Sequence, residues 1–132
     1  MRVAVLMLAV LVGCRRTVEL PVLATLPDFT LTDERKQPLT KRDLAGQVWV
    51  ADFIFTNCPG ACIRMSKQFQ QVQETLPGVR LVSFSVDPAR DTPEVMAAYA
   101  KRNHADAARW RFVVGPEVAK VSDAAMLGRQ GL

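Results

Sequence analysis

Two cysteines, Cys58 and Cys62, are the residues of this 132-residue chain whose type and spacing best suit chemistry. They stand four positions apart, directly after an apolar run, where Pro59 predicts the start of a helix. Residues four positions apart in a helix lie on one face, one turn from each other. We therefore expect neighbouring sulfur atoms, the first of which faces the positive end of a helix dipole that favours thiolate over thiol.

Such a pair suits two kinds of chemistry. Cys58 and Cys62 can close a disulfide if the first helical turn adjusts, and as thiolates they are soft ligands suited to Cu(I). Structural zinc is a poorer interpretation, because it takes four ligands and the chain offers one histidine beside this pair. A purely structural disulfide remains an alternative, although so short a loop gives little closure entropy.

The third cysteine, Cys14, ends a different pattern. Arg2 is followed by an apolar run over residues 3–12 and by Gly13, which is the shape of a cleaved export signal. Ten apolar residues are too few for a permanent membrane span, which takes about 20. Residues 1–14 resemble a bacterial lipoprotein signal, so we expect Cys14 to be lipidated; an uncleaved anchor or a buried strand is the alternative. Outside the cytosol, the other two cysteines would oxidise unless they are reduced or bind a metal.

The elements that must position the cysteine pair follow from the apolar patterns. After a tether over residues 15–26, we expect one domain over residues 27–132. Apolar runs predict strands at 29–32, 48–55, 79–86 and 111–114, and the run at 48–55 is typical of a central strand covered on both faces. Stripes and caps predict a helical turn at 40–44, helices at 59–76 and 93–103, and a last helix that ends near 128. This alternation indicates an α/β fold with a mostly parallel sheet and flanking helices.

Composition and charge argue against two other classes of function. The net charge of +4 comes from 17 basic and 13 acidic residues scattered along the chain, without aromatic residues interleaved among basic ones. We therefore expect no nucleic-acid partner. The sequence also has no glycine-rich phosphate loop, so nucleotide chemistry is not expected.

Two motifs together resemble one known family. FTNCPGAC over residues 55–62 and SVDPARDTP over residues 85–93 are similar, in sequence and mutual spacing, to the Sco/SenC family of copper-handling, thioredoxin-like proteins. The similarity runs over about residues 26–115. It implies a thioredoxin-like fold, a membrane-anchored location in the bacterial envelope, and copper held by Cys58 and Cys62.

The resemblance also implies a role and a partner. Family members help to assemble the copper centre of cytochrome c oxidase, by delivering copper or by reducing the cysteines of the oxidase subunit that carries it. Asp87 matches an acidic residue of the second motif and is expected near the copper site or on the partner surface, with a plain turn residue as the alternative. For Arg90 and Asp91 a surface pair and a helix cap are favoured.

The chain departs from the family pattern near its end. The family's copper site takes a third ligand, a histidine in a downstream loop, in a region that finishes with an antiparallel hairpin and a helix. This sequence stops at Leu132, so we expect the C-terminal hairpin and helix to be missing, and Ile63 stands where a second proline is common. The single histidine, His104, lies upstream of that loop, and we expect a solvated residue near a helix end rather than a ligand.

Three functional hypotheses stay open at this point. The first is a copper metallochaperone that acts through the cysteine pair. The second is a thiol-disulfide oxidoreductase of the envelope that uses the same cysteines on another thiol protein. The third is a non-functional fragment of a longer homologue, and a gene fragment, a partial sequence and a shortened redox-active homologue are all consistent with the departures above.

Overall fold

Strands and helices alternate along the part of the chain that the computed structural model describes, residues 20–130. The predicted strands and helices are confirmed, and most of their predicted ends lie within two residues of the observed ends. In chain order the elements are β1 (Thr30–Asp33), β2 (Pro38–Thr40), the 3-10 turn η1 (Lys41–Leu44), β3 (Trp49–Ile54), α1 (Ala61–Thr75), β4 (Arg80–Ser85), α2 (Pro93–Arg102), β5 (Trp110–Val114) and α3 (Val118–Gln130).

The predicted signal over residues 1–14, with Cys14, and the first part of the tether lie outside the described residues. Within residues 20–130, no helix is long and apolar enough to cross a membrane. Strand β2 is absent from the predicted strands, because Pro38 is unfavourable in the middle of a strand. It is accommodated as the first residue of a three-residue strand at the end of the sheet, where a missing amide hydrogen is tolerated.

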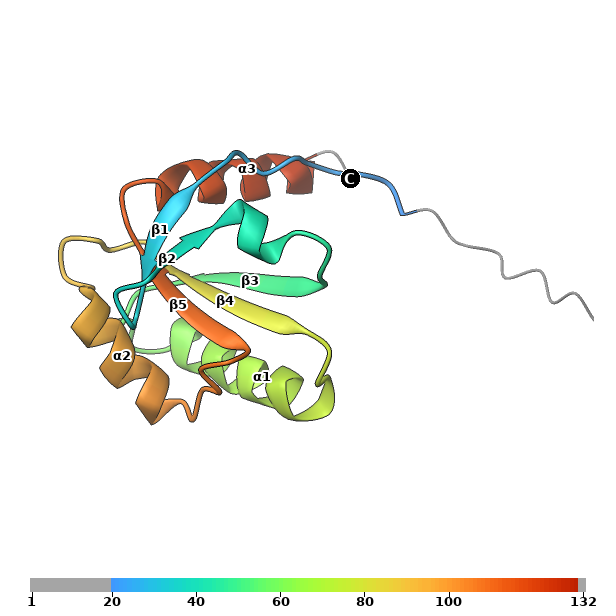
Figure 1. Cartoon of the computed structure of the whole chain (residues 1–132). Helices are drawn as coiled ribbons and strands as arrows, with labels where there is room; N and C mark the ends of the chain where they lie inside the picture. Colours follow the sequence, from blue (N-terminus) through green and yellow to red (C-terminus); the bar gives the residue numbers. More distant parts are fainter. Residues whose placement is uncertain (1–19, 131–132) are drawn as a thin grey trace, which may run out of the picture.

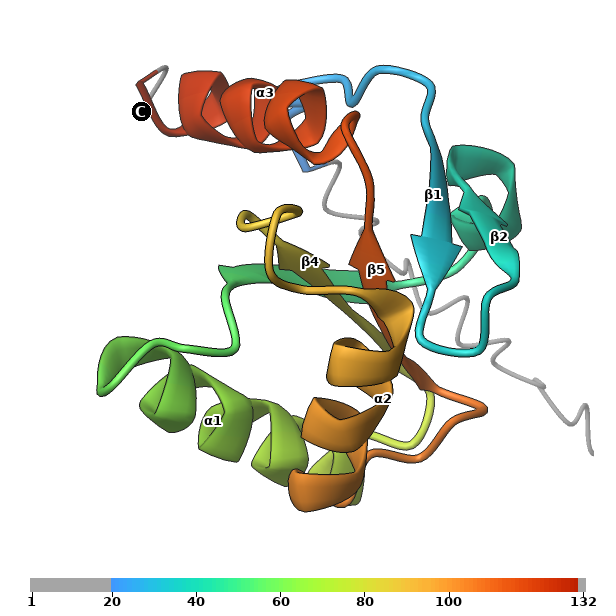
Figure 2. The same ribbon diagram turned by 90° about the vertical axis from the view of Figure 1, so that its left-hand side faces the viewer.

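The five strands form one sheet with the order β2-β1-β5-β4-β3. Strands β3, β4 and β5 run parallel, whereas β1 is antiparallel to both β5 and β2. Helices α1 and α2 cover one face of the sheet and α3 covers the other, as Figures 1 and 2 show. Because β3 and β4 are parallel neighbours, the loops that follow them emerge at the same edge of the sheet.

The prediction of a central strand over residues 48–55 is wrong. Strand β3 stands last in the sheet and pairs only with β4 among the described strands, and Val50 is 41% exposed. The apolar run reflects burial of the two faces: Phe53 packs against one core cluster and Ile54 belongs to the other. An apolar run reports covered faces and carries no information about whether both edges are paired. The strand buried most completely is β4, from Leu81 to Ser85.

Two hydrophobic clusters, one on each face of the sheet, hold the helices in place. Successive side chains of β4 alternate between them, since Leu81 belongs to the cluster under α1 and α2, and Val82 to the cluster under α3. Trp110 is fully buried, and its indole nitrogen donates to the Ser83 hydroxyl at 2.9 Å. A buried indole N–H without a partner would destabilise the fold, so this bond lets the largest side chain sit in the core.

Helix α1 presents the predicted apolar stripe to the sheet. Cys62 and Phe69 are buried and Met65 and Val72 are partly buried against the same cluster, but Leu76, expected in the stripe, lies beyond the helix and is half exposed. Burial of Phe69 against Trp110, with ring centroids 5.6 Å apart, contributes roughly 2–3 kcal/mol. The stripe therefore fixes the rotation of α1 and turns Cys62 toward the sheet.

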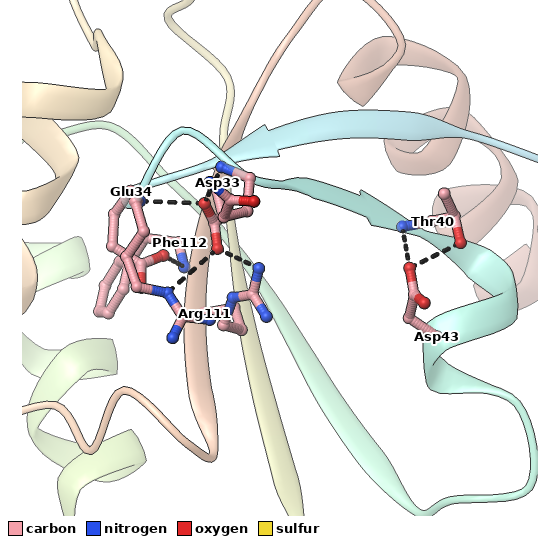
Figure 3. A network of polar contacts seen from close by, with 8 residues as sticks. Asp33, Glu34, Thr40, Asp43, Arg111 and Phe112 are labelled. Carbon is pink, nitrogen blue, oxygen red and sulfur yellow. Dashed lines mark hydrogen bonds and ion pairs between the residues drawn. The ribbon is translucent and has the colours of Figure 1, made fainter.

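A polar network on the other side of the sheet ties the β1–β2 turn to β5 (Figure 3). The fully buried Asp33 carboxylate accepts from the Arg111 guanidinium and from the backbone amides of Arg35 and Gln37. Glu34 accepts from the backbone amide of Phe112 at 2.9 Å. A buried ion pair with its remaining lone pairs satisfied fixes strand register, so the network secures the antiparallel part of the sheet.

Asp52 is the one charged residue of β3, and its side chain lies in an apolar environment. It is 5% exposed, and neither carboxylate oxygen has a hydrogen-bond partner among the described residues. Alternation along β3 puts it on the same face as Ile54, toward α1, beside a groove of about 300 Å³. Burial raises the pKa of Asp52 to about 6.

This burial predicts a specific dependence of stability on pH. The unfolded carboxyl titrates near its ordinary value of 3.8 and the folded one at about 6, so the folded chain binds the extra proton between these values. The free energy of unfolding therefore falls as pH rises through that window, by about 3 kcal/mol in total. Asp52→Asn removes this part of the pH dependence.

Urea unfolding at about pH 4.5 and about pH 8 measures about 2 kcal/mol of this effect, because the unfolded carboxyl is already largely ionised at about pH 4.5. The exposed Asp28→Asn is the matched control and should keep the wild-type difference between the two pH values, since that side chain is 96% exposed. An Asp52→Asn protein with the full wild-type difference would contradict the assignment.

Candidate functional site

The cysteine pair lies where β3 hands over to α1. Helix α1 begins at Ala61 after Gly60 as N-cap, so the predicted start at Cys58-Pro59 is two residues early. Cys58 belongs to a turn instead, in which its amide donates to the Phe55 carbonyl at 3.2 Å. Cys62 occupies the first helical turn. The predicted placement at a strand-to-helix junction is confirmed, although the first cysteine precedes the helix.

The two cysteines differ in exposure and in hydrogen bonding. Cys58 is partly exposed, whereas Cys62 is 5% exposed, and both are free thiols. The Cys58 Sγ accepts a hydrogen bond from the backbone amide of Cys62 at 3.4 Å. The pair thus combines an accessible sulfur with a covered one.

The environment shifts the two thiols in opposite directions. A hydrogen bond from the Cys62 thiol lowers the pKa of Cys58, and the free amides of Cys62, Gly60 and Ala61 at the start of α1 add to the effect. Burial raises the pKa of Cys62, and the negative charges of Cys58 and Asp52 raise it further. At neutral pH the accessible thiol is therefore the better nucleophile and the covered thiol keeps its proton.

Asp91 is the residue that holds the cysteine loop in position, and the sequence interpretation missed it. We expected a helix cap, but the cap of α2 is Thr92, and Asp91 is 2% exposed. The Asp91 carboxylate accepts from the amide of Thr56 at 3.1 Å, from the Thr56 hydroxyl at 2.5 Å and from the Ser85 hydroxyl at 2.5 Å. The interpretation of Asp91 as the helix cap is therefore wrong, because its carboxylate is bound by Thr56 and Ser85 and Thr92 caps α2.

A signal for this contact exists in the sequence. Strands β3 and β4 were both predicted, and the carboxyl ends of parallel neighbours meet at one edge of a sheet. Thr56 follows the first of these strands and Asp91 follows the second, so the two strand predictions already imply that polar residues of the two loops can meet.

The remaining candidate residues do not join the cysteines. Asp87 pairs with Arg90 at 3.6 Å, with its side chain 26% exposed, in the turn after β4. His104 is exposed and follows α2, with a left-handed backbone conformation (φ 52°), in agreement with the expected solvated residue near a helix end. Across residues 20–130, no group of three histidine, cysteine or acidic side chains lies close enough to hold a metal ion. Cys14 lies outside the described residues.

The Asp91 contacts predict a destabilised cysteine loop in Asp91→Asn. The substitution removes a charged acceptor of three hydrogen bonds. It also places a side-chain NH2 group, itself a donor, against the existing donors of Thr56 and Ser85. We therefore expect a loss of roughly 2–4 kcal/mol in the free energy of unfolding. Asp87→Asn, which loses one partly exposed ion pair, should cost less than about 1 kcal/mol. Chemical denaturation measures both, and faster hydrogen exchange at the Thr56 amide in Asp91→Asn alone localises the effect. Equal losses in the two variants would contradict it.

The opposed thiol environments predict ordered alkylation. Iodoacetamide should modify Cys58 before Cys62, with a rate that rises at lower pH than for an ordinary thiol. Cys62→Ala removes the hydrogen bond that contributes most to this shift, so the pH profile of Cys58 alkylation should move upward. Mass spectrometry of the native protein over a pH series checks both statements, and preferential modification of Cys62 would overturn them.

Comparison with known proteins agrees with this geometry. The sequence model of the SCO1/SenC family matches residues 19–126. The chain is 32% identical over 102 residues to the SCO1 protein homolog of Bacillus subtilis. The matched region covers 74% of this chain and 53% of that protein. The chain thus spans about half the length of this curated relative.

Solved structures of relatives show the same architecture. A SCO1/SenC family lipoprotein from Bacillus anthracis matches with a TM-score of 0.74 and 32% identity, over 83% of this chain and 68% of that one. BsSco, described as a cytochrome c oxidase assembly protein of the Sco family with a disulfide switch, matches at 0.69 and 31%, over 78% and 62%. ScoI from Bradyrhizobium japonicum, solved with copper bound, matches at 0.65 and 26%, over 80% and 68%. The expected thioredoxin-like α/β fold is confirmed, and the chain belongs to the SCO1/SenC family.

Proposed function

We propose that this chain is a copper-binding metallochaperone of the Sco type that assists maturation of the copper centre of cytochrome c oxidase. The observation that carries the proposal is the meeting of Cys58 and Cys62 at the start of α1, where the Cys58 Sγ is partly exposed and its pKa is lowered. Two adjacent sulfur donors, one of them readily ionised, fit a soft monovalent cation such as Cu(I). Copper bound to one solved relative gives further support.

The donor set fits Cu(I) better than Cu(II). Within the described residues no third histidine, cysteine or acidic side chain joins the pair, and two thiolates would be soft ligands for Cu(I). Nitrogen or oxygen ligands, which Cu(II) prefers, are not gathered at this place in residues 20–130. We therefore assign copper as a reduced cargo held by Cys58 and Cys62.

The partner and the location are part of the same proposal. The recipient would be the oxidase subunit that carries the copper centre, in line with the assembly role named for BsSco. The chain would be anchored in the bacterial cell envelope, on the periplasmic side, through lipidated Cys14, in line with the lipoprotein from Bacillus anthracis. Asp87, partly exposed in the turn after β4, is a candidate residue of the partner surface.

Copper titration tests the assignment of the ligands. The reduced protein should take one Cu(I) from a competing chelator, and Cys58→Ser or Cys62→Ser should each weaken binding by at least about a hundredfold, because a hydroxyl is a poor ligand for Cu(I). His104→Ala is the control and should bind as the wild type does, since that side chain is exposed and lies outside the pair. Uptake that is unaffected by either cysteine substitution would contradict the proposal.

A second candidate function is thiol-disulfide exchange with another thiol protein. The specific observation that favours it is the opposed shift of the two cysteines, since an exposed nucleophile beside a covered, protonated partner is the arrangement that exchange requires. The disulfide switch named for BsSco gives further support. The two functions use the same sulfur atoms and do not exclude each other.

The reduction potential of the pair distinguishes this function from a structural disulfide. We expect a value between roughly −120 and −270 mV, the range of exchange-active pairs, rather than below about −300 mV, where structural disulfides lie. Equilibration with glutathione buffers, read by alkylation, measures it, and Cys62→Ser is the control that cannot close the disulfide. A value below that range would leave the pair without an exchange function.

A further inference from the structure

Cys58 is one of the residues that line a small pocket. It has a volume of about 240 Å³, and it is formed by the cysteine loop, the first turn of α1 and the end of α2. Its lining residues are Thr56, Cys58, Ile63, Tyr99, Arg102 and Asn103. The pocket is smaller than the sites that hold drug-sized ligands, so it suits a short side arm rather than a whole large molecule.

Most polar groups of the pocket already have partners. The Tyr99 hydroxyl is hydrogen-bonded to the Ser66 hydroxyl at 2.9 Å. The Asn103 side-chain amide donates to the Tyr99 carbonyl at 2.9 Å. Thr56 is held by Asp91. These walls are therefore fixed by internal bonds and offer little free hydrogen-bonding capacity to a ligand.

Arg102 is the exception. Its guanidinium lies 5.3 Å from the centroid of the Tyr99 ring, and it forms no ion pair with any of the described residues. It supplies the only cationic side chain in the lining. A planar guanidinium held against an aromatic ring is preorganised for a planar anion, which it can bind through two parallel hydrogen bonds. Ile63, which is 48% exposed, adds an apolar wall for the carbon atoms of an arm.

We propose that this pocket selects carboxylate-bearing disulfides and thiols as exchange partners for Cys58, with Arg102 binding the carboxylate. The proposal rests on the second candidate function above and names its substrate class. A carboxylate a few bonds from the reacting sulfur would reach Arg102 while that sulfur meets the Cys58 thiolate, because both groups line the same small pocket. The guanidinium thereby orients the partner for attack.

The reaction balances without an added reagent. The Cys58 thiolate attacks the nearer sulfur of the disulfide, a bond forms between these two sulfurs, and the second sulfur leaves as a thiolate with the electron pair and takes a proton from water. Cys62, after it loses its proton to water, attacks the Cys58 sulfur and releases the remaining thiolate. The small disulfide is reduced by two electrons, and Cys58 and Cys62 are oxidised to a disulfide.

Three small disulfides of similar size and different charge test the selection. The fully reduced protein is mixed with anionic dithiodipropionate, neutral hydroxyethyl disulfide or cationic cystamine, and the second-order rate constants are measured by stopped flow. The readout is the ratio of each rate constant to that of the neutral disulfide, divided by the same ratio measured with free 2-mercaptoethanol, because the leaving thiols differ in pKa and hence in intrinsic reactivity. We expect a ratio of about ten for the anionic disulfide, the factor that one charge-assisted contact of about 1.4 kcal/mol gives, and a ratio below one for cystamine.

Two substitutions that each remove one positive charge, Arg102→Gln and Arg64→Gln, distinguish binding in the pocket from the overall electrostatic field of the protein. Arg102→Gln should lower the anionic ratio to about one, and Arg102→Lys should keep part of it, since a lysine retains the charge without the planar fork. Arg64→Gln is the matched control. Arg64 is exposed in the first turn of α1, with its guanidinium near Gly60, but it does not line the pocket. Its loss should leave the anionic ratio within about twofold of the wild type.

The outcomes distinguish this inference from the function on which it rests. Reduced protein that reacts with none of the three disulfides would overturn the exchange function itself. Reaction with all three at equal rates, or equal losses of preference in Arg102→Gln and Arg64→Gln, would leave exchange intact and overturn the role of the pocket. Arg102 is exposed and contributes one ring contact, so its variants are expected to fold, and a thermal transition at the wild-type temperature checks this.

Discussion

The buried carboxylate of Asp91 is the contact on which the functional end of the molecule depends. Strands β3 and β4 bring two loops to one edge of the sheet, but the pairing of the strands ends before either loop begins. Asp91, which lies in the second loop, bridges this gap, since it accepts from Thr56 in the first loop and from Ser85, the last residue of β4. Without it the cysteine turn would keep the packing of Phe55 and Cys58 against the core but lose its side-chain hydrogen bonds to the neighbouring loop.

Fixing that turn explains why two cysteines of one chain behave differently. With the turn fixed, the Cys58 sulfur stays next to the free amides of α1, and the apolar stripe of α1 draws Cys62 toward the sheet. Exposure and amide contacts favour a thiolate at the first position, and burial favours a thiol at the second. The negative charge of Asp52 in β3 also raises the pKa of Cys62 and so increases the difference between the two thiols.

Local pattern was sufficient for most of the fold. The apolar stripe of α1, the Thr92-Pro93 start of α2 and the β-rich runs of β3, β4 and β5 each report their own burial, so a single sequence predicts them. The position of β3 at the end of the sheet and the burial of Asp91 were missed, because both depend on which elements become neighbours. The cysteine pair was predicted, since strand, turn and helix are contiguous there, whereas the pocket at Arg102 required the end of α2 to meet that turn.

Copper binding and thiol exchange make different demands on this one site, and the geometry shows where they diverge. If the pair holds Cu(I) as proposed, both sulfurs would have to be deprotonated, and the raised pKa of Cys62 would oppose binding. Exchange needs only the Cys58 thiolate in its first step, and the protonated Cys62 then prevents premature closure of the disulfide. The asymmetry that favours Cys58 as a nucleophile would therefore weaken the proposed copper binding at low pH. For the same reason protonation of Cys62 would favour release of the metal to the proposed recipient.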